Sequence, residues 1–351
     1  MSTAENAEAV RLLLDELGLS IEDLHQGNRT TPTLAEYLPR VIEASGAGAR
    51  RTYGPYWIRA TASLGNRRLD EITATDLQVL IQQAVNERVL RRNDRGGSST
   101  REHMIRALRA IYSRAVADNL LAPHRNPAAR VIKPPRPETP RRALSPDELA
   151  AINSAVATTG NDATLDCLLM RLHTETGCRR GGALGLLEQD LDPDWALIRL
   201  VEKRDTVRWQ PVSPTLMRAL LDHRAGRGSG LPSDQPLLRY RNGNPLTKRR
   251  YDHLWERVGE RLPWVASQGI STHWLRHTTL TWIERRFGYG VARAYGGHLD
   301  ARGPATTTCI RATLHEVATA LAALSGEDHP CARPPTPGTL PPHWPWTPSD
   351  L

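Results

Sequence analysis

Apolar residues recur at helical spacing throughout residues 32–131. In the first run the apolar positions share one helical face: Leu34, Tyr37, Leu38 and Val41. A second run spans residues 75–89, and a third begins where Ser99 and Glu102 have the spacing of a capping box. The pattern predicts a small helical bundle for this part of the chain.

A second patterned region covers residues 145–325. It opens with a helix-start signal, because Ser145 can cap the helix and Pro146 suits its first turn. Two strand-like segments, 196–201 and 207–212, flank a polar turn and predict a β-hairpin. Helical patterns fill most of the rest as far as Leu324. The expected fold class is therefore mostly α with a small β-hairpin or sheet, an α+β arrangement in two domains.

Three segments lie outside these two regions. Residues 1–31 hold one short amphipathic stretch and are expected to be an appendage. Residues 132–144 combine proline with arginine and predict an extended basic linker between the domains. From residue 327 to the end the chain has eight prolines in 25 residues, so residues 326–351 are expected to be a tail without stable structure.

The charge balance favours a polyanionic partner. Against 38 acidic residues the chain has 46 basic ones, and only Lys133, Lys203 and Lys248 are lysines. Arginine suits phosphate and base edges, although a GC-rich genome would also enrich it. Six arginines of the third helical run and the linker are candidate DNA contacts, with a merely solvated face as the alternative: Arg101, Arg106, Arg109, Arg136, Arg141 and Arg142.

Cysteine usage gives no sign of a metal site or a disulfide framework. The four cysteines show no CxxC spacing and no neighbouring histidine cluster. No cofactor or metal is therefore expected. The N-terminus lacks a basic and then apolar leader, and no stretch is long enough to span a membrane, so we expect a cytoplasmic protein associated with the nucleoid.

Four short motifs carry candidate chemistry. In Thr176-Gly177-Cys178-Arg179 the glycine ends one helix and the arginine opens the next, which places a guanidinium beside free backbone N–H groups. His273 and Arg276 are three residues apart and share a helical face. The other two motifs are Gly297-His298 and Thr306-Thr307-Thr308-Cys309.

The order of these motifs resembles the tyrosine recombinases, or phage integrases, over residues 32–325. The resemblance implies strand exchange through a covalent link between protein and DNA. It implies that Arg179 and Arg276 grip the scissile phosphate and that Lys203 protonates the departing 5′ oxygen. It also implies that His273 assists proton transfer and that His298 hydrogen-bonds the phosphate or positions the attacking residue. Lys248 also lies in a plausible turn, but the hairpin context favours Lys203. The implied architecture is a two-domain clamp around double-stranded DNA.

Two positions depart from the family pattern. Gly182 stands where the family usually has an acidic residue, so a carboxylate that would balance Arg179 is missing. Cys309 stands at the position of the nucleophilic tyrosine, and no tyrosine follows Tyr295. Because cysteine is several ångströms shorter than tyrosine, in-line attack is expected to be impaired.

The sequence therefore predicts a tyrosine-type site-specific recombinase in which Cys309, at the position of the nucleophilic tyrosine, impairs cleavage of the DNA strand. Cys309 would mark an engineered stop or a natural loss of cleavage, or it would attack slowly through a thiophosphate-type link. The alternative is a cleavage-inactive DNA-binding regulator that retains the fold. The apolar helix of residues 313–324 is expected to dock on a neighbouring protomer and form dimers and tetramers on DNA, with packing in cis as the other possibility.

Overall fold

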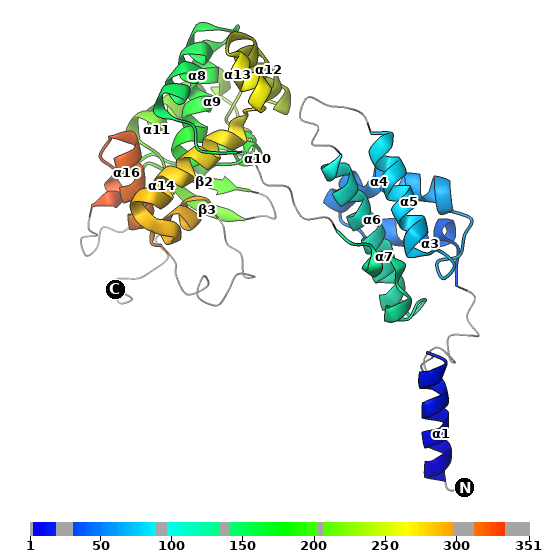
Figure 1. Cartoon of the computed structure of the whole chain (residues 1–351). Helices are drawn as coiled ribbons and strands as arrows, with labels where there is room; N and C mark the ends of the chain where they lie inside the picture. Colours follow the sequence, from blue (N-terminus) through cyan, green and yellow to red (C-terminus); the bar gives the residue numbers. More distant parts are fainter. Residues whose placement is uncertain are drawn as a thin grey trace. The chain divides into compact units, whose positions relative to one another are not determined.

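The computed structural model describes residues 3–18, 31–88, 97–133, 141–202, 206–297 and 312–333. The chain divides into two compact units, residues 1–138 and residues 139–351 (Figure 1). The division falls inside the predicted linker, 132–144. Arg136 of that linker lies outside the described residues.

The N-terminal unit is helical, as the periodicity predicted. Its elements are α1 (Thr3–Glu16), α3 (Leu34–Glu43), α4 (Ala47–Leu64), α5 (Ala74–Asn86), α6 (Ser98–Ala117), η1 (Pro123–Arg125) and α7 (Pro127–Arg130). Helices α3, α4, α5 and α7 all pack against α6. The four predicted apolar positions of α3 are buried in this core. Trp57 of α4 is also buried, and its indole N–H donates to the carbonyl of Ala107 at 3.0 Å.

The predicted capping box at the start of α6 is wrong. Helix α6 begins one residue earlier than Ser99, and its N-cap is Gly97, which has a φ of 75° and no side-chain cap. The carboxylate of Glu102 instead forms ion pairs with Arg106 at 2.6 Å and with Lys133 at 2.8 Å. Glu102 therefore serves surface ion pairs, and a left-handed glycine starts the helix.

The C-terminal unit is built from helices around a three-stranded antiparallel sheet. Its elements are α8 (Pro146–Thr158), α9 (Ala163–Thr176), α10 (Arg180–Leu184), η2 (Glu188–Asp190), β1 (Leu191–Asp192), β2 (Leu197–Val201), β3 (Val207–Pro211), α11 (Pro214–Gly228), α12 (Lys248–Arg261), α13 (Pro263–Gln268), α14 (Thr272–Tyr295), α16 (Leu314–Ser325) and η3 (Pro330–Ala332). The predicted hairpin is present as β2 and β3, which pair with Arg199 opposite Trp209. The cap at Ser145 is present as well, as a full capping box with Glu148.

Helix α9 is the central element of this unit, and it packs against α8, α11, α14 and α16. Helix α14 is bent at Gly288, whose φ of 82° and ψ of 168° are not helical. Helices α9 and α14 pack against each other, and α14 is drawn beside strands β2 and β3 (Figure 1). Residues distant in the sequence come together near the end of α9, the end of β2 and the first turns of α14.

The C-terminal helix packs in cis. Helix α16 contacts α14, α9 and β3 of its own unit, and Val317 and Leu321 of its apolar face are buried there. The expectation that residues 326–351 lack structure is wrong for their first part. His329 is buried and its ring bonds to the carbonyl of Ala196 at 3.2 Å, and Glu327 accepts from Arg171 at 3.0 Å. Residues 334–351 lie outside the described residues.

No helix in the ranges that the structure describes is both long and apolar enough to cross a membrane.

A buried ion-pair network ties α9 to α12. The fully buried carboxylate of Asp166 accepts from Arg250 at 2.7 Å through both oxygens and from Arg257 at 2.5 Å. Two guanidinium groups therefore depend on one carboxylate away from water.

Replacing this carboxylate should strongly destabilise the C-terminal unit. We expect Asp166→Ala to lower the free energy of unfolding by about 3–5 kcal/mol, because two partly buried arginines lose their counter-charge. Asp252→Ala is the matched control, because Asp252 pairs with Arg180 at 3.0 Å on the surface. That control should cost under about 1 kcal/mol in urea unfolding followed by tryptophan fluorescence. Equal losses for the two variants would contradict the assignment.

Candidate active site

The first motif arginine lies where one helix ends and the next begins. Helix α9 ends at Gly177, whose φ of 56° is left-handed, and Arg179 is the N-cap of α10. The Glu202 carboxylate, at the end of β2, accepts the Arg179 backbone N–H at 2.6 Å and its Nη1 at 2.8 Å. Arg179 is therefore fixed by its backbone and by its guanidinium, while about a third of its side chain stays exposed (34 %).

The second motif arginine comes from α14 and reaches the same place. Arg276 is buried, and its guanidinium donates to the carbonyls of Gly177 and Gly296 at 2.5 Å each. Its Nη1 lies 4.0 Å from the Glu202 carboxylate. The structure thus brings Arg179 and Arg276, which are 97 positions apart in the sequence, around one carboxylate.

A third arginine, Arg208 of β3, belongs to this cluster and was not expected from the motifs. Its guanidinium donates to the carbonyl of Tyr295 at 2.6 Å, and its Nε lies 3.8 Å from Glu202. The hairpin register could have indicated it. In the register of β2 and β3, Arg208 lies opposite the fully buried Leu200. Directly opposed residues point to the same face of a sheet, so Arg208 also points to the buried face.

The cluster of Arg179, Arg208, Arg276 and Glu202 has three positive charges and one negative charge, a formal net charge of +2. Burial, followed by the charge of Arg179, lowers the pKa of Arg276 to about 10. Burial also lowers the pKa of Arg208. A pKa near 10 still leaves Arg276 protonated at neutral pH. The cluster is therefore cationic and suits an anion such as a phosphodiester.

His273 lies one helical turn before Arg276, on the exposed side of α14. Partial desolvation, followed by the charge of Arg141 and of Arg276, lowers the pKa of His273. The ring is therefore neutral at neutral pH and can accept a proton. The charge of Arg141 thus acts on His273, whereas the neighbouring Arg142 forms a bidentate ion pair with Glu148 at 2.5 and 2.6 Å.

Lys203, His298 and Cys309 lie outside the described residues, but the residues that directly precede Lys203 and His298 are described. Glu202 directly precedes Lys203, and its N–H donates to the carbonyl of Thr206 at 2.8 Å. Gly297 directly precedes His298. The alternative lysine, Lys248, is exposed at the first position of α12. The roles of these residues stay predictions.

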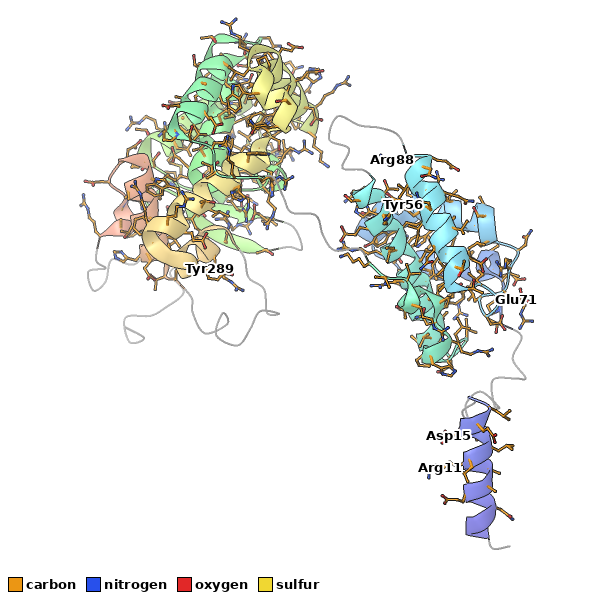
Figure 2. The ribbon with its side chains drawn as sticks, viewed as in Figure 1. Arg11, Asp15, Tyr56, Glu71, Arg88 and Tyr289 are labelled. Atoms are coloured by element: carbon orange, nitrogen blue, oxygen red, sulfur yellow. The ribbon has the colours of Figure 1, made fainter. Side chains whose placement is uncertain are left out.

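The two tyrosines of the second half of α14 differ in their surroundings. Tyr295 is fully buried, and its hydroxyl donates to the carbonyl of Glu175. Burial raises its pKa. Tyr289 lies on the surface, 59 % exposed (Figure 2). Tyr295 is therefore a core residue that holds the end of α9 beside the end of α14.

The candidate DNA contacts of the N-terminal unit already have protein partners. Arg109 donates to the carbonyls of Ala128 and Val131 at 3.3 and 3.0 Å. Arg106 pairs with Glu102, and Arg101 donates to Gln82 at 3.2 Å. Arg109 serves the fold by holding the end of α7, whereas the side chains of Arg101 and Arg106 remain partly exposed. Within the described ranges, no three His, Cys, Asp or Glu side chains gather as metal ligands would.

Residues 142–302 match the sequence model of the phage integrase family, and this match covers the whole arginine cluster. The C-terminal unit is a phage integrase domain. The family comprises the tyrosine-type site-specific recombinases. Comparison with curated proteins gives no significant match.

Solved structures share the fold at low sequence identity. The Tn1549 transposon integrase in complex with a circular intermediate DNA matches with a TM-score of 0.63 and 16 % identity, over 80 % of this chain and 96 % of that one. A lambda integrase tetramer bound to a Holliday junction matches with a TM-score of 0.60 and 16 % identity, over 85 % of this chain and 88 % of that one. The likeness extends beyond the integrase domain, since the domain alone is shorter than these matches.

A buried histidine supports the loop that carries Arg179 in the integrase domain. His173 of α9 bonds through Nδ1 to the carbonyl of Cys178 at 3.1 Å and through Nε2 to the hydroxyl of Tyr251 at 2.9 Å. Burial lowers the pKa of His173 to about 4. Burial raises the pKa of Cys178 to about 11, so this thiol is not an activated nucleophile.

The integrase domain should lose stability in acid through this histidine. The folded-state pKa is about 4 and the ordinary value is 6.5. Between these values the unfolded chain binds the proton and the folded chain does not. Stability is thus fully present above about pH 6.5 and falls by about 1.4 kcal/mol per pH unit toward pH 4.

Urea unfolding from pH 4 to pH 8 measures this slope. His173→Gln should reduce the slope by the contribution of one proton, at the expense of a lower stability at pH 7. The pKa of His223 is also lowered to about 4. His223→Gln, measured alongside, should therefore reduce the slope by the same amount as His173→Gln. An unchanged slope in His173→Gln would contradict the assignment.

Proposed function

We propose that this chain is a site-specific recombinase that binds a DNA phosphodiester in the cluster of Arg179, Arg208 and Arg276. The observation that carries the proposal is the convergence of Arg179 and Arg276 on Glu202 within a phage integrase domain. A net charge of +2 offsets the phosphodiester charge and the further negative charge that develops in the transition state.

Each motif residue has a role in this proposal. Arg179 and Arg276 bind the non-bridging oxygens of the scissile phosphate. Lys203 protonates the departing 5′ oxygen, neutral His273 assists proton transfer, and His298 binds the phosphate or positions the attacking group. The broken bond's energy is kept in a covalent link between protein and DNA, so the reaction needs no high-energy cofactor.

Cys309 stands at the position of the attacking residue, so it determines how fast the strand is cleaved. A thiol ionises more readily than a phenol, but its side chain is shorter, and phosphoryl transfer needs in-line geometry. We propose that strand cleavage is impaired in this sequence. Neither Tyr289 nor Tyr295 follows the Gly297-His298 motif, and Tyr295 is held in the core.

We further propose that the two units clamp double-stranded DNA, with Arg101, Arg106, Arg136 and Arg141 among the phosphate contacts. The structures that resemble this chain include dimers and tetramers on DNA. By analogy the chain assembles into dimers and tetramers on its target, in the cytoplasm at the nucleoid. Docking of α16 on a neighbour would require it to leave its buried position against α14.

The alternative function is a DNA-binding regulator that competes at recombination sites without cleaving them. Cys309 favours it, since binding through the arginine cluster does not need a nucleophile. The two functions share the phosphate-binding cluster. They differ only in the covalent step.

A covalent adduct distinguishes these functions. A duplex selected from a random library by the chain itself would be nicked to make a suicide substrate. We expect Cys309→Tyr to form a denaturant-resistant adduct about 100-fold faster than the parent chain, because the longer side chain reaches the phosphorus in line. Cys309→Phe is the matched control, with similar size and no hydroxyl. An inactive Cys309→Tyr chain would favour the regulator.

Stoichiometry on the same duplex tests assembly. We expect two copies on a duplex with paired sites and four on a junction made from two such duplexes, as measured by light scattering. The control is a duplex with one half-site, which should bind one copy. A single copy on the paired sites at every concentration would contradict assembly.

A further inference from the structure

Two motif glycines leave the space that the Glu202 and Arg208 side chains occupy. A Cβ atom at Gly182 would lie 3.1 Å from Cγ of Glu202 and 3.4 Å from its Oε1. Such contacts are tighter than side chains ordinarily make, so even alanine would press on the carboxylate. The family's acidic residue belongs at this position, and here a different carboxylate fills the space beside it.

The second glycine faces the other member of the pair. A Cβ atom at Gly297 would lie 2.7 Å from Cδ and Nε of Arg208, and 3.5 Å from Oε2 of Glu202. The φ of Gly297 is +62°, which independently favours glycine. The hairpin pair of Glu202 and Arg208 therefore lies between Gly182 and Gly297.

The Glu202 carboxylate is arranged as a support for Arg179. One oxygen accepts the Arg179 backbone N–H at 2.6 Å, and the other accepts its Nη1 at 2.8 Å. The second oxygen also faces Arg208 at 3.8 Å and Arg276 at 4.0 Å. The Glu202 side chain has no exposed surface. A carboxylate in this position fixes the angle of one guanidinium and offsets the repulsion among three.

We propose that Glu202 is the positioning residue of the arginine cluster and does from the hairpin what an acidic residue at position 182 would do from α10. This inference rests on the proposed function, because it assigns Glu202 a task in phosphate cleavage. It also links the hairpin to the cluster, since Glu202 directly precedes Lys203. Gly182 is then required because Glu202 is present.

Moving the carboxylate back to α10 tests the proposal in the Cys309→Tyr chain. Glu202→Ala should slow adduct formation at saturating protein on the order of 100-fold, because Arg179 loses its orientation. Gly182→Glu alone should also slow the reaction, because its Cβ meets Glu202. The double variant, Gly182→Glu with Glu202→Ala, should recover to within about tenfold of the parent rate. The same Gly182→Glu change is thus harmful with Glu202 and beneficial without it.

Controls separate positioning from folding. Because Glu202→Ala removes the buried counter-charge of three guanidinium groups, it should lower the unfolding midpoint, as Asp166→Ala does. Adduct rates are therefore compared at a temperature at which urea unfolding shows that the parent, the single variants and the double variant are all folded. DNA affinity should stay within about threefold of the parent value, since other donors still contact DNA. Glu188→Gln, which alters a carboxylate paired with Arg224 at 2.6 Å, should leave the adduct rate unchanged. A double variant no faster than Glu202→Ala, or a Glu202→Ala chain as fast as its parent, would overturn the proposal.

A second readout does not depend on cleavage. The guanidinium ¹⁵N resonance of Arg179, identified by its loss in Arg179→Lys, reports the bond to Glu202. We expect its protons to exchange with solvent faster in Glu202→Ala and to regain protection in the double variant. If Cys309→Tyr forms no adduct but this pattern holds, the proposed function fails while the positioning role of Glu202 stands. If the resonance is unaffected by Glu202→Ala, the positioning role fails.

Discussion

The ion-pair cluster around the Glu202 carboxylate is the interaction on which the site depends. Three guanidinium groups approach one another within a largely buried space, and their mutual repulsion would oppose folding without a counter-charge. Glu202 supplies that charge, and carbonyl groups of Gly177 and Gly296 accept hydrogen bonds from Arg276, while the carbonyl of Tyr295 accepts one from Arg208. The result is a cationic cluster that is held together before any DNA binds.

The fold around this cluster sets its precision. Helix α9 ends at a left-handed glycine, His173 braces the following loop, and the Tyr295 hydroxyl joins α14 to the last turn of α9. The β-hairpin contributes Glu202 and Arg208 from opposite strands. A preorganised cluster favours catalysis because its charges do not need to reorganise when the transition state forms. The cost is a buried charge network that a single neutral substitution can disturb.

The sequence predicted the helical class, the hairpin and the meeting of Arg179 with Arg276, because each rests on local signals and an ordered motif set. It did not predict Glu202 or Arg208, since neither belongs to a motif and their importance arises from the register of β2 on β3 and from the space at Gly182. The missing acidic residue at position 182 suggested an unbalanced Arg179, whereas the structure shows a carboxylate reaching Arg179 from the hairpin. The capping box at Ser99 and an unstructured segment at 326–333 were also wrong, because Glu102 is engaged by Arg106 and Lys133, and His329 is buried against Ala196.

A structure of the chain bound to its selected duplex measures the central claim most directly. The account predicts one backbone phosphate within hydrogen-bond distance of both Arg179 and Arg276, with Glu202 still bonded to Arg179 behind it. A duplex whose phosphates all avoid the two arginines, or a bound state in which these arginines separate from each other, would contradict it.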